Sequence, residues 1–201
     1  MRDEATPVSP VTASNEELAE SERNIWAREQ RLDRHIALVG FMGAGKSSLG
    51  RALADRLQRP FFDTDLCVQE SQNVTVQELF ASGREAEFRT LEAAVIGELL
   101  AGPPAVLSLG GGALMSDSVR ASLRERCFVI HLYLSWAEVR ASLDGLRVER
   151  PLLQRPLADV HSLYLERQKT YRDADVRIHA PRDDIERAIE HVLYALRRAA
   201  R

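Results

Sequence analysis

The sequence contains few lysines, few cysteines and no long apolar run. Of its 27 basic residues only Lys46 and Lys169 are lysines, and the other 25 are arginines. The two cysteines, Cys67 and Cys127, have neither metal-ligand spacing nor the number that a disulfide framework needs, so we expect buried, unreactive thiols. No apolar run approaches the roughly 18 residues of a membrane span, and the first residues lack the charged and then apolar pattern of a secretory signal. We therefore expect a cytoplasmic protein that does not bind membranes.

The chain also lacks an excess of charge of either sign. Its 30 acidic and 27 basic residues give a formal net charge of −3, which gives no reason to expect a basic face for nucleic acid. A length of 201 residues with 45% apolar content suits one well-buried globular domain with a short appendage. We expect a monomer that acts on small molecules.

The first 34 residues differ in composition from the rest. Residues 1–14 carry proline, serine and threonine with little apolar content, which predicts disorder, whereas residues 15–34 are charged and helix-prone. This segment holds 8 acids and 5 bases and so carries the whole net charge. We predict an N-terminal extension over residues 1–34, which is solvated, docked on a partner or left from a linker, and a globular domain over residues 35–201.

A glycine-rich loop at residues 40–47 fits the phosphate-binding pattern G-x-x-x-x-G-K-[ST]. It directly follows an apolar run, residues 35–39, that predicts a buried strand. Glycines allow successive backbone N–H groups to point at a polyphosphate, and the helix that follows presents its positive end to the same anion. Lys46 would contact the β- and γ-phosphates, and the Ser47 hydroxyl would ligate Mg²⁺. The motif predicts a nucleoside triphosphate site, but it does not distinguish a kinase from a GTPase or an ATPase.

Short apolar runs alternate with helical patterns through the rest of the chain. The apolar runs that predict strands are residues 35–39, 60–62, 105–109, 128–134 and 176–178. Helical patterns occupy residues 46–57, 85–100, 117–124, 157–171 and 184–198, and two further helices begin near Thr75 and Ser135. Crossovers of this length imply an α/β fold with a five-stranded parallel sheet and helices on both faces. Ligands should then bind beyond the carboxyl ends of the strands.

Acidic and glycine residues follow the second and third predicted strands. Asp63 and Asp65 are two residues apart, so their carboxylates face the same way if the strand continues through them. One of them would help to hold hydrated Mg²⁺ and the other would accept a proton from an attacking hydroxyl. The alternative is that both acids cap and charge the start of the next helix. Residues 110–112 are three consecutive glycines, which imply close backbone approach to another group or an unusual turn.

Three arginines stand at positions that could converge on this edge of the sheet, namely Arg89, Arg150 and Arg167. The planar fork of arginine suits carboxylate and phosphate groups. Arg150 lies in a polar stretch between two predicted helices, where loop closure would exclude water from a reacting phosphate. With 25 arginines in the chain, no single one of them predicts a site by itself.

The order of these patterns resembles that of the shikimate kinase family. The resemblance covers six elements: G-x-x-G-x-G-K-S at residues 40–47, F-x-D-x-D at 61–65, E-x-x-F-R-x-x-E at 85–92, S-L-G-G-G at 108–112, R-P-L-L at 150–153 and R-x-x-x-Y at 167–171. It implies a three-layer P-loop kinase fold. It also implies transfer of the ATP γ-phosphoryl group to the 3-hydroxyl of shikimate, on the path to chorismate and the aromatic amino acids.

The resemblance further implies a role for each matching residue. ATP would be bound by Gly43, Ala44, Gly45, Lys46, Ser47, Ser48 and Arg150. Shikimate would be bound by Asp65, Arg89, Gly110, Gly111, Gly112 and Arg167. Lys46 and Arg150 would stabilise charge on the transferred phosphoryl group, and Asp65 would be the candidate base. Ser47 would ligate Mg²⁺, with Asp63 assisting through water.

The chain departs from the family pattern at two places. Arg84 stands where the family usually has a glycine. The arginine that often contacts adenine in the family is replaced by Leu143 or, with one inserted residue, by Ser142. Arg140 or Arg147 would then take over the adenine contact.

Two other functions are compatible with parts of the pattern. One is a kinase for another small hydroxy acid such as gluconate, although the aspartate pair together with the triple glycine favours shikimate. The other is a catalytically silent, ligand-sensing module of the same fold, against which the intact Lys46, Asp63 and Asp65 argue.

Overall fold

The computed structural model describes residues 34–146, 156–179 and 184–199. The predicted N-terminal extension, except for Arg34, lies outside the described residues, and so do Arg147 and Arg150. The boundary of the extension and the role of Arg150 therefore stay predictions.

A five-stranded parallel sheet forms the centre of the described domain, as predicted. Its strands are β1 (His35–Val39), β2 (Phe61–Asp63), β3 (Val106–Ser108), β4 (Cys127–Tyr133) and β5 (Val176–His179). They lie side by side in the order β2-β3-β1-β4-β5. The central strand β1 is buried along its whole length, as expected for a strand covered on both faces.

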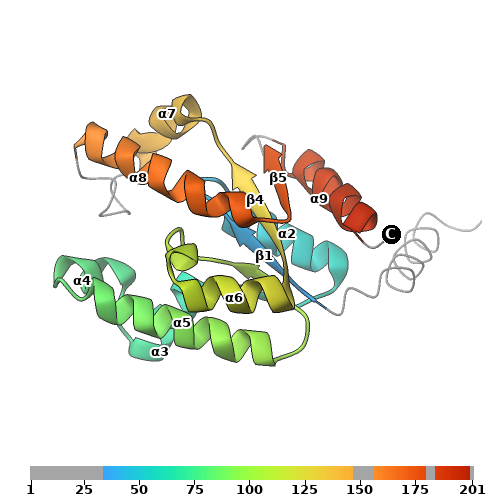
Figure 1. Cartoon of the computed structure of the whole chain (residues 1–201), viewed down its shortest axis with the longest axis horizontal. Helices are drawn as coiled ribbons and strands as arrows, with labels where there is room; N and C mark the ends of the chain where they lie inside the picture. The colour runs from blue at the N-terminus through green and yellow to red at the C-terminus, as the bar shows by residue number, and fades with distance from the viewer. Residues whose placement is uncertain (1–33, 147–155, 180–183, 200–201) are drawn as a thin grey trace, which may run out of the picture. The chain divides into compact units, whose positions relative to one another are not determined.

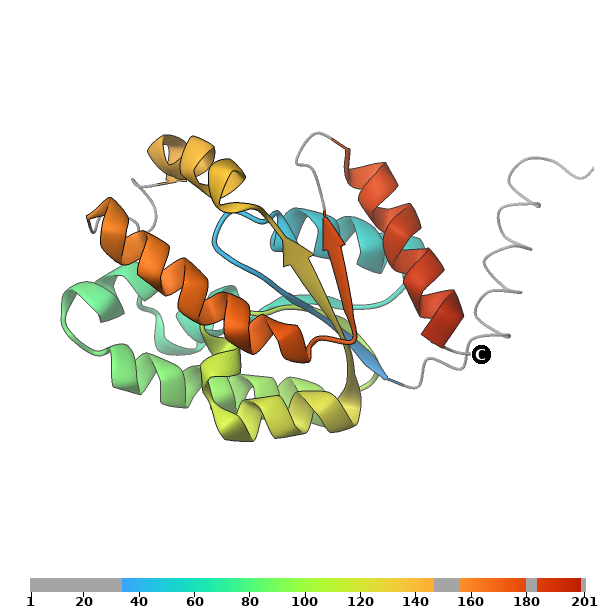
Figure 2. The ribbon, with the colours of Figure 1, turned by 45° about the horizontal axis from the view of Figure 1, so that its top comes forward.

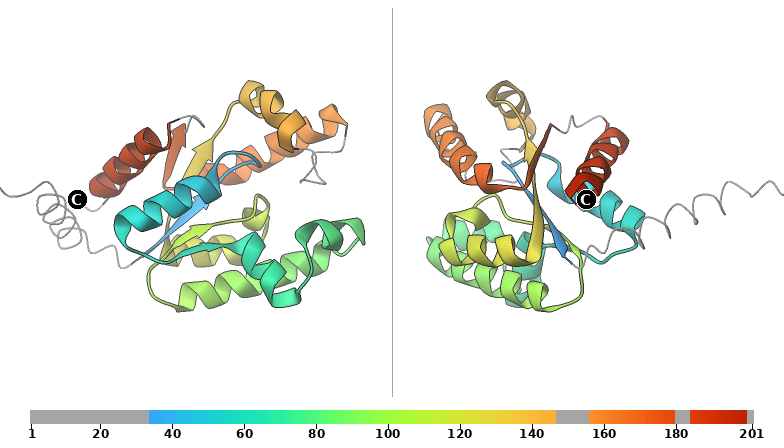
Figure 3. Two further views of the ribbon diagram at one scale, coloured as in Figure 1. Left: turned by 180° about the vertical axis from the view of Figure 1, so that it is seen from behind. Right: turned by 45° about the vertical axis from the view of Figure 1, so that its right-hand side comes forward.

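Helices cover both faces of this sheet. The helices are α2 (Lys46–Leu57), α3 (Thr64–Gln72), α4 (Val76–Ala81), α5 (Glu85–Ala101), α6 (Asp117–Arg126), α7 (Trp136–Leu146), α8 (Leu157–Thr170) and α9 (Ile185–Ala199). Helices α2 and α9 lie together on one face, and α5, α6 and α8 cover the other (Figure 1 and the right-hand view of Figure 3). Within the described ranges, one 3₁₀ turn, Ala113–Met115, follows the glycine triplet and another, Tyr171–Asp173, follows α8.

Local sequence signals set where several helices begin. Thr75 caps α4 with a complete capping box, because its hydroxyl accepts from the Glu78 N–H while the Glu78 carboxylate accepts from the Thr75 N–H. Ser135 and Glu138 make the same pair of bonds before α7. Figure 2 shows α7 beyond the tip of β4 and beside α8, and the rings of Trp136 and His161 lie 4.4 Å apart between these two helices.

A small apolar cluster fixes the start of α5. Val68 from α3, Leu79 from α4 and Phe88 from α5 are all buried against one another. Phe88 also meets the edge of the Phe80 ring, with centroids 5.3 Å apart. Because Arg89 follows Phe88 directly, this packing sets the position from which the Arg89 side chain leaves the helix.

The two cysteines are only partly as expected. Cys127 is buried and Cys67 is half-buried. Burial raises the pKa of the Cys127 thiol to about 12 and also raises the pKa of Cys67. Both thiols therefore stay protonated near neutral pH and are poor nucleophiles.

Candidate active site

The phosphate loop joins β1 to α2 through backbone conformations that require glycine. Gly40 has φ +152°, and a side chain there would collide with the carbonyl of Leu132 on the neighbouring strand. Gly45 caps α2 in the left-handed region with φ +79°, and the space where its side chain would be is open. The N-terminus of α2 therefore faces accessible space, where its dipole and free N–H groups favour an anion.

Lys46 and Ser47 connect this loop to its surroundings. The Lys46 ammonium donates to the carbonyl of Gly40 at 2.9 Å and lies 3.3 Å from that of Phe41. The Ser47 hydroxyl donates to Asp63 Oδ2 at 2.6 Å and lies 3.3 Å from the Ser108 hydroxyl. The loop that begins after β1 is thus joined by side chains to the ends of β2 and β3.

The two candidate acids do not lie on one extended strand, so that prediction was wrong. Strand β2 ends at Asp63 and α3 begins at Thr64. Asp63 caps this helix, since its Oδ1 accepts from the Asp65 N–H at 3.1 Å, and aspartate is among the preferred N-cap residues. The alternative of a helix cap is confirmed for Asp63, which at the same time accepts from Ser47. Asp65 lies in the first turn of α3 and is half-buried.

The glycine triplet is required by close packing rather than by backbone conformation, since none of the three has positive φ. A Cβ on Gly110 would collide with Glu92 and would lie 2.6 Å from Asp65 Oδ1. At Gly111 it would lie 2.9 Å from Arg167 Nη1, and at Gly112 it would lie 2.5 Å from Arg89 Nη2. The backbone of residues 110–112 therefore lies directly against two carboxylates and two guanidinium groups.

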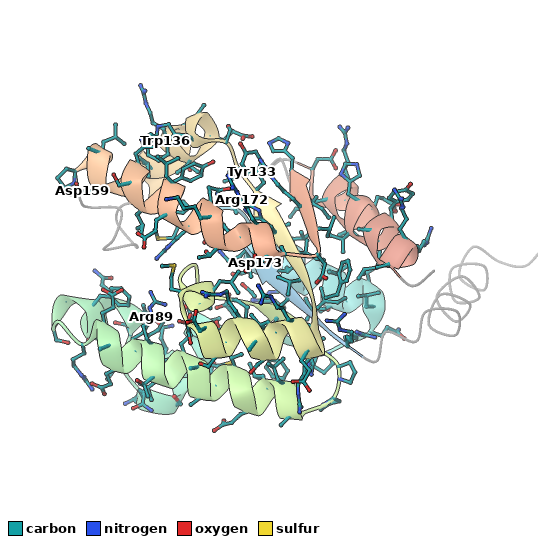
Figure 4. All side chains as sticks on the ribbon, viewed as in Figure 1. Arg89, Tyr133, Trp136, Asp159, Arg172 and Asp173 are labelled. Carbon is teal, nitrogen blue, oxygen red and sulfur yellow. The ribbon has the colours of Figure 1, made fainter. Side chains whose placement is uncertain are left out.

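One cavity gathers the residues predicted to bind the acceptor. Its lining consists of Met42, Asp65, Val76, Phe80, Phe88, Arg89, Gly110, Gly111, Gly112 and Arg167. Arg89 lies on the side of α5 that faces α8, as Figure 4 shows. A larger groove of about 810 Å³ lies between β5 and α9, but none of the predicted site residues lines it. The predicted site residues therefore indicate the smaller cavity as the candidate active site.

The charged groups around this cavity are largely buried. Arg89 Nη1 lies 2.6 Å from Glu92 Oε2, and the guanidinium is 5.0 Å from the centre of the Phe88 ring. Glu92 is only 2% exposed, and its Oε1 has no hydrogen-bond partner among the described residues. Burial raises the pKa of the Glu92 carboxyl, although the neighbouring Arg89 opposes this shift. Arg89 is therefore the main group that favours the charged form of Glu92.

Arg167 is a buried cation that makes no ion pair with any described residue. It is 4% exposed, and burial lowers the pKa of its guanidinium. Its guanidinium carbon lies 5.7 Å from the centroid of the Phe41 ring in the phosphate loop. Because an arginine stays charged in a protein and a buried charge is costly without a partner, this site favours an anionic ligand.

The comparisons with known proteins identify the family. The model of the shikimate kinase family matches residues 42–197. The chain belongs to the shikimate kinase family. A shikimate kinase from Nitrobacter winogradskyi is 44% identical over 152 residues, which are 75% of this chain and 70% of that protein. One from Ruegeria pomeroyi is 37% identical and covers 82% of this chain and 86% of its own.

Solved shikimate kinases share the fold. The Acinetobacter baumannii enzyme, in complex with shikimate, has a TM-score of 0.74 at 31% identity, covering 82% of this chain and 94% of its own. The Aquifex aeolicus enzyme has a TM-score of 0.72, also at 31% identity, with coverage of 83% and 98%. A gluconokinase from Sinorhizobium meliloti, at 20% identity and a TM-score of 0.50, shares the fold alone. These comparisons confirm the predicted P-loop kinase fold and shikimate kinase function, and they give neither alternative function better support.

The donor atoms of this shikimate kinase family member fit a magnesium ion with few protein ligands. The Ser47 hydroxyl and the Asp63 carboxylate are hard oxygen donors and lie within 2.6 Å of each other. Among the described residues no group of three His, Cys, Asp or Glu side chains is placed to hold a metal. Mg²⁺ usually keeps several waters and binds through one or two side chains plus substrate phosphates, so this arrangement suits it.

None of the helices in the described ranges has the length and apolar content that a membrane span needs.

Three buried side chains at the site received no individual role from the sequence. Glu92 is the last residue of the E-x-x-F-R-x-x-E pattern, and its spacing from Arg89 could have indicated the ion pair. Tyr171 ends the R-x-x-x-Y pattern, and its hydroxyl donates to the Gly111 carbonyl at 2.7 Å. Burial raises the pKa of Tyr171 to about 12. Thr64 lies between the two acids and shows no sequence signal of its own.

The raised pKa of Glu92 predicts how Glu92→Gln changes stability with pH. The folded-state pKa of Glu92 lies above its unfolded value of 4.5, so the charge of Glu92 costs stability as pH rises through the folded pKa. Glutamine does not titrate. The melting temperature of Glu92→Gln minus that of wild type should therefore increase from pH 4.5 upward and then level off, as thermal unfolding across pH would show.

Glu78→Gln is the control with the opposite sign. Hydrogen bonds from Thr75 lower the pKa of Glu78 below its ordinary value, so its charge stabilises the protein above the unfolded pKa. The melting temperature of Glu78→Gln minus wild type should fall with rising pH over the acid range. Curves of the same slope for both variants would contradict the assignment for Glu92.

Proposed function

We propose that this chain transfers the γ-phosphoryl group of ATP to the 3-hydroxyl of shikimate, with the phosphate loop as donor site and the cavity at residues 110–112 as acceptor site. The observation that carries the proposal is the convergence of both sites at Asp63 and Asp65. Asp63 accepts from Ser47 of the phosphate loop, and Asp65 lies against Gly110. The relative that was solved with shikimate supports the choice of acceptor.

The donor site consists of Gly43, Ala44, Gly45, Lys46, Ser47 and Ser48. Their backbone N–H groups and the N-terminus of α2 bind the ATP phosphates. Lys46, which lies against the loop carbonyls, neutralises charge on the β- and γ-phosphates during transfer. Ser47 and, through water, Asp63 would hold Mg²⁺, and the ion would supply further neutralisation of the phosphate charge. Phosphoryl transfer depends mostly on such positioning and electrostatics.

The acceptor site binds a hydroxy acid through groups of opposite charge. Arg167 and Arg89 bind the shikimate carboxylate, and Arg167 is available because it has no ion pair among the described residues. Asp65 binds the ring hydroxyls and accepts the proton of the 3-hydroxyl as it attacks. The glycine backbone at Gly110, Gly111 and Gly112 leaves room for the ligand where side chains would fill the cavity.

Three parts of the proposal rest on the sequence alone. Arg150 is proposed to stabilise the transferred phosphoryl group and to contact ATP, by its place in the R-P-L-L pattern. A cytoplasmic location and a monomeric state are likewise inferred from composition.

The dependence of ADP release on the acceptor tests this function. With ATP and Mg²⁺, shikimate should stimulate ADP release strongly, whereas quinate and gluconate should stimulate it little. The proposed acceptor site, with Arg167, Arg89 and Asp65, requires both a carboxylate and correctly placed ring hydroxyls. Release that does not depend on an acceptor, or a preference for gluconate, would contradict the proposal.

The two acids should differ in their effects. Asp65→Asn should lower kcat about a hundredfold or more, because the candidate base is lost, while the KM for ATP stays close to wild type. Asp63→Asn keeps an N-cap residue at the start of α3, so its main effect should be a higher Mg²⁺ concentration at half-maximal rate. Steady-state kinetics over a range of Mg²⁺ would measure both. Wild-type turnover of Asp65→Asn, or the same Mg²⁺ dependence in the two variants, would overturn these roles.

A further inference from the structure

Thr64 is a fully buried polar residue between the two candidate acids, with 0% of its surface exposed. It is the first residue of α3. Its hydroxyl accepts from the Gly110 N–H at 3.0 Å and donates to the Ser108 carbonyl at 3.4 Å. A threonine hydroxyl has one donor and two acceptor sites, so both bonds form at once. Neither is a bond within its own helix.

These two bonds begin where the backbone pairing of β2 with β3 stops. The last pair of that ladder is Asp63 with Ser108. One residue later the chain turns into α3, and the two strands can no longer exchange backbone hydrogen bonds. The Thr64 hydroxyl makes the next contact instead and thereby joins the first turn of α3 to the first glycine of the triplet.

The same contact sets how Asp65 meets the glycine backbone. Asp65 follows Thr64 directly, and a Cβ on Gly110 would lie 2.6 Å from Asp65 Oδ1. Gly110 thus donates to the Thr64 hydroxyl and also lies against the carboxylate of the candidate base. A shift of Gly110 would also move Gly111 and Gly112, which lie against Arg167 and Arg89.

Neither of the two hydrogen bonds of Thr64 goes to the phosphate loop. The bonds of Ser47 go to the side chains of Asp63 and Ser108, whereas Thr64 bonds the backbone of Ser108 and Gly110. Loss of the Thr64 hydroxyl would therefore affect the acceptor site more than the ATP site.

We propose that Thr64 is a positioning residue for the acceptor: its buried hydroxyl holds residues 110–112 and Asp65 at the separation that binds the hydroxy acid and aligns its hydroxyl. The proposal rests on the proposed function, because it assigns the cavity to shikimate. It predicts that the defect of a variant without the hydroxyl is specific to one of the two substrates.

Thr64→Val is the direct test, since valine keeps the branched shape and removes the hydroxyl. The Gly110 N–H then loses its acceptor, and the KM for shikimate should rise about tenfold. The KM for ATP should stay close to wild type. Thr64→Ser keeps the hydroxyl and should restore the KM for shikimate to near the wild-type value. Steady-state kinetics with each substrate varied in turn, well below the melting temperature, measures the KM for shikimate and the KM for ATP in both variants.

Thr90→Val is a matched control. The Thr90 hydroxyl is exposed and donates only to the Ala86 carbonyl within α5, so both KM values should be unchanged. If Thr64→Val does not fold, Thr64→Cys keeps the volume with a weaker acceptor. It should then show a raised KM for shikimate that Thr64→Ser does not show.

Three results would overturn the proposal. The first is a wild-type KM for shikimate in Thr64→Val or, if that variant does not fold, in Thr64→Cys. The second is an equal rise of both KM values, which would show a defect without preference for a substrate. A loss of kcat alone would count in the same way, because a purely structural defect removes folded enzyme. The third is a defect in Thr64→Ser as large as in Thr64→Val. Failure of the proposed function is distinguishable, because wild type itself would then release no ADP in response to shikimate.

Discussion

The parallel register at the carboxyl edge of the sheet determines the rest of the site. Ser108 at the end of β3 stands opposite Leu38 on β1 and Asp63 on β2, so β2 and β3 end in one row and β1 ends one residue beyond it. The phosphate loop, the candidate base and the glycine triplet each begin two residues beyond that row, at Gly40, Asp65 and Gly110. The proposed donor site and the proposed acceptor site therefore lie at the same edge of the sheet without any long connection between them, as expected for open α/β sheets.

The proposed acceptor cavity is unusual because its charged side chains are buried against the glycine backbone of residues 110–112. Burial raises the pKa of Glu92 and lowers the pKa of Arg167, so each charge costs stability that packing must offset elsewhere. A side chain with a shifted pKa in a cleft indicates function only when a local cause does not explain the shift. The pKa of Glu138, for example, is lowered to about 2, first by its hydrogen bond from Ser135, which caps a helix. Within the part of the chain that the structure describes, no comparable capping bond explains the shifted pKa of Glu92 or of Arg167.

Sequence reasoning predicted those parts of the site that depend on local pattern. The order of strands and helices, the phosphate loop and the close approach at residues 110–112 follow from periodicity and from the space that only glycine leaves. The extended geometry assumed for Asp63 and Asp65 was wrong, because the preference of aspartate for the N-cap ends the strand at Asp63. Thr64 required the fold, since its burial and its partners in β3 and residues 110–112 leave no trace in a single sequence. For Glu92 the spacing from Arg89 could have indicated the ion pair, but not its burial. The part played by Arg150 lies outside the described residues.

The central claim is that the buried Arg167, which makes no ion pair with any described residue, binds the carboxylate of the acceptor. Calorimetric titration of shikimate into Arg167→Met tests it most directly, since methionine keeps the apolar stem and removes the charge. Arg187→Met is the control, because Arg187 is exposed on α9, away from the cavity residues. Loss of one partner of a buried charge pair should weaken binding about 30-fold or more, while the control binds like wild type. Equal affinity of both variants for shikimate would contradict the account.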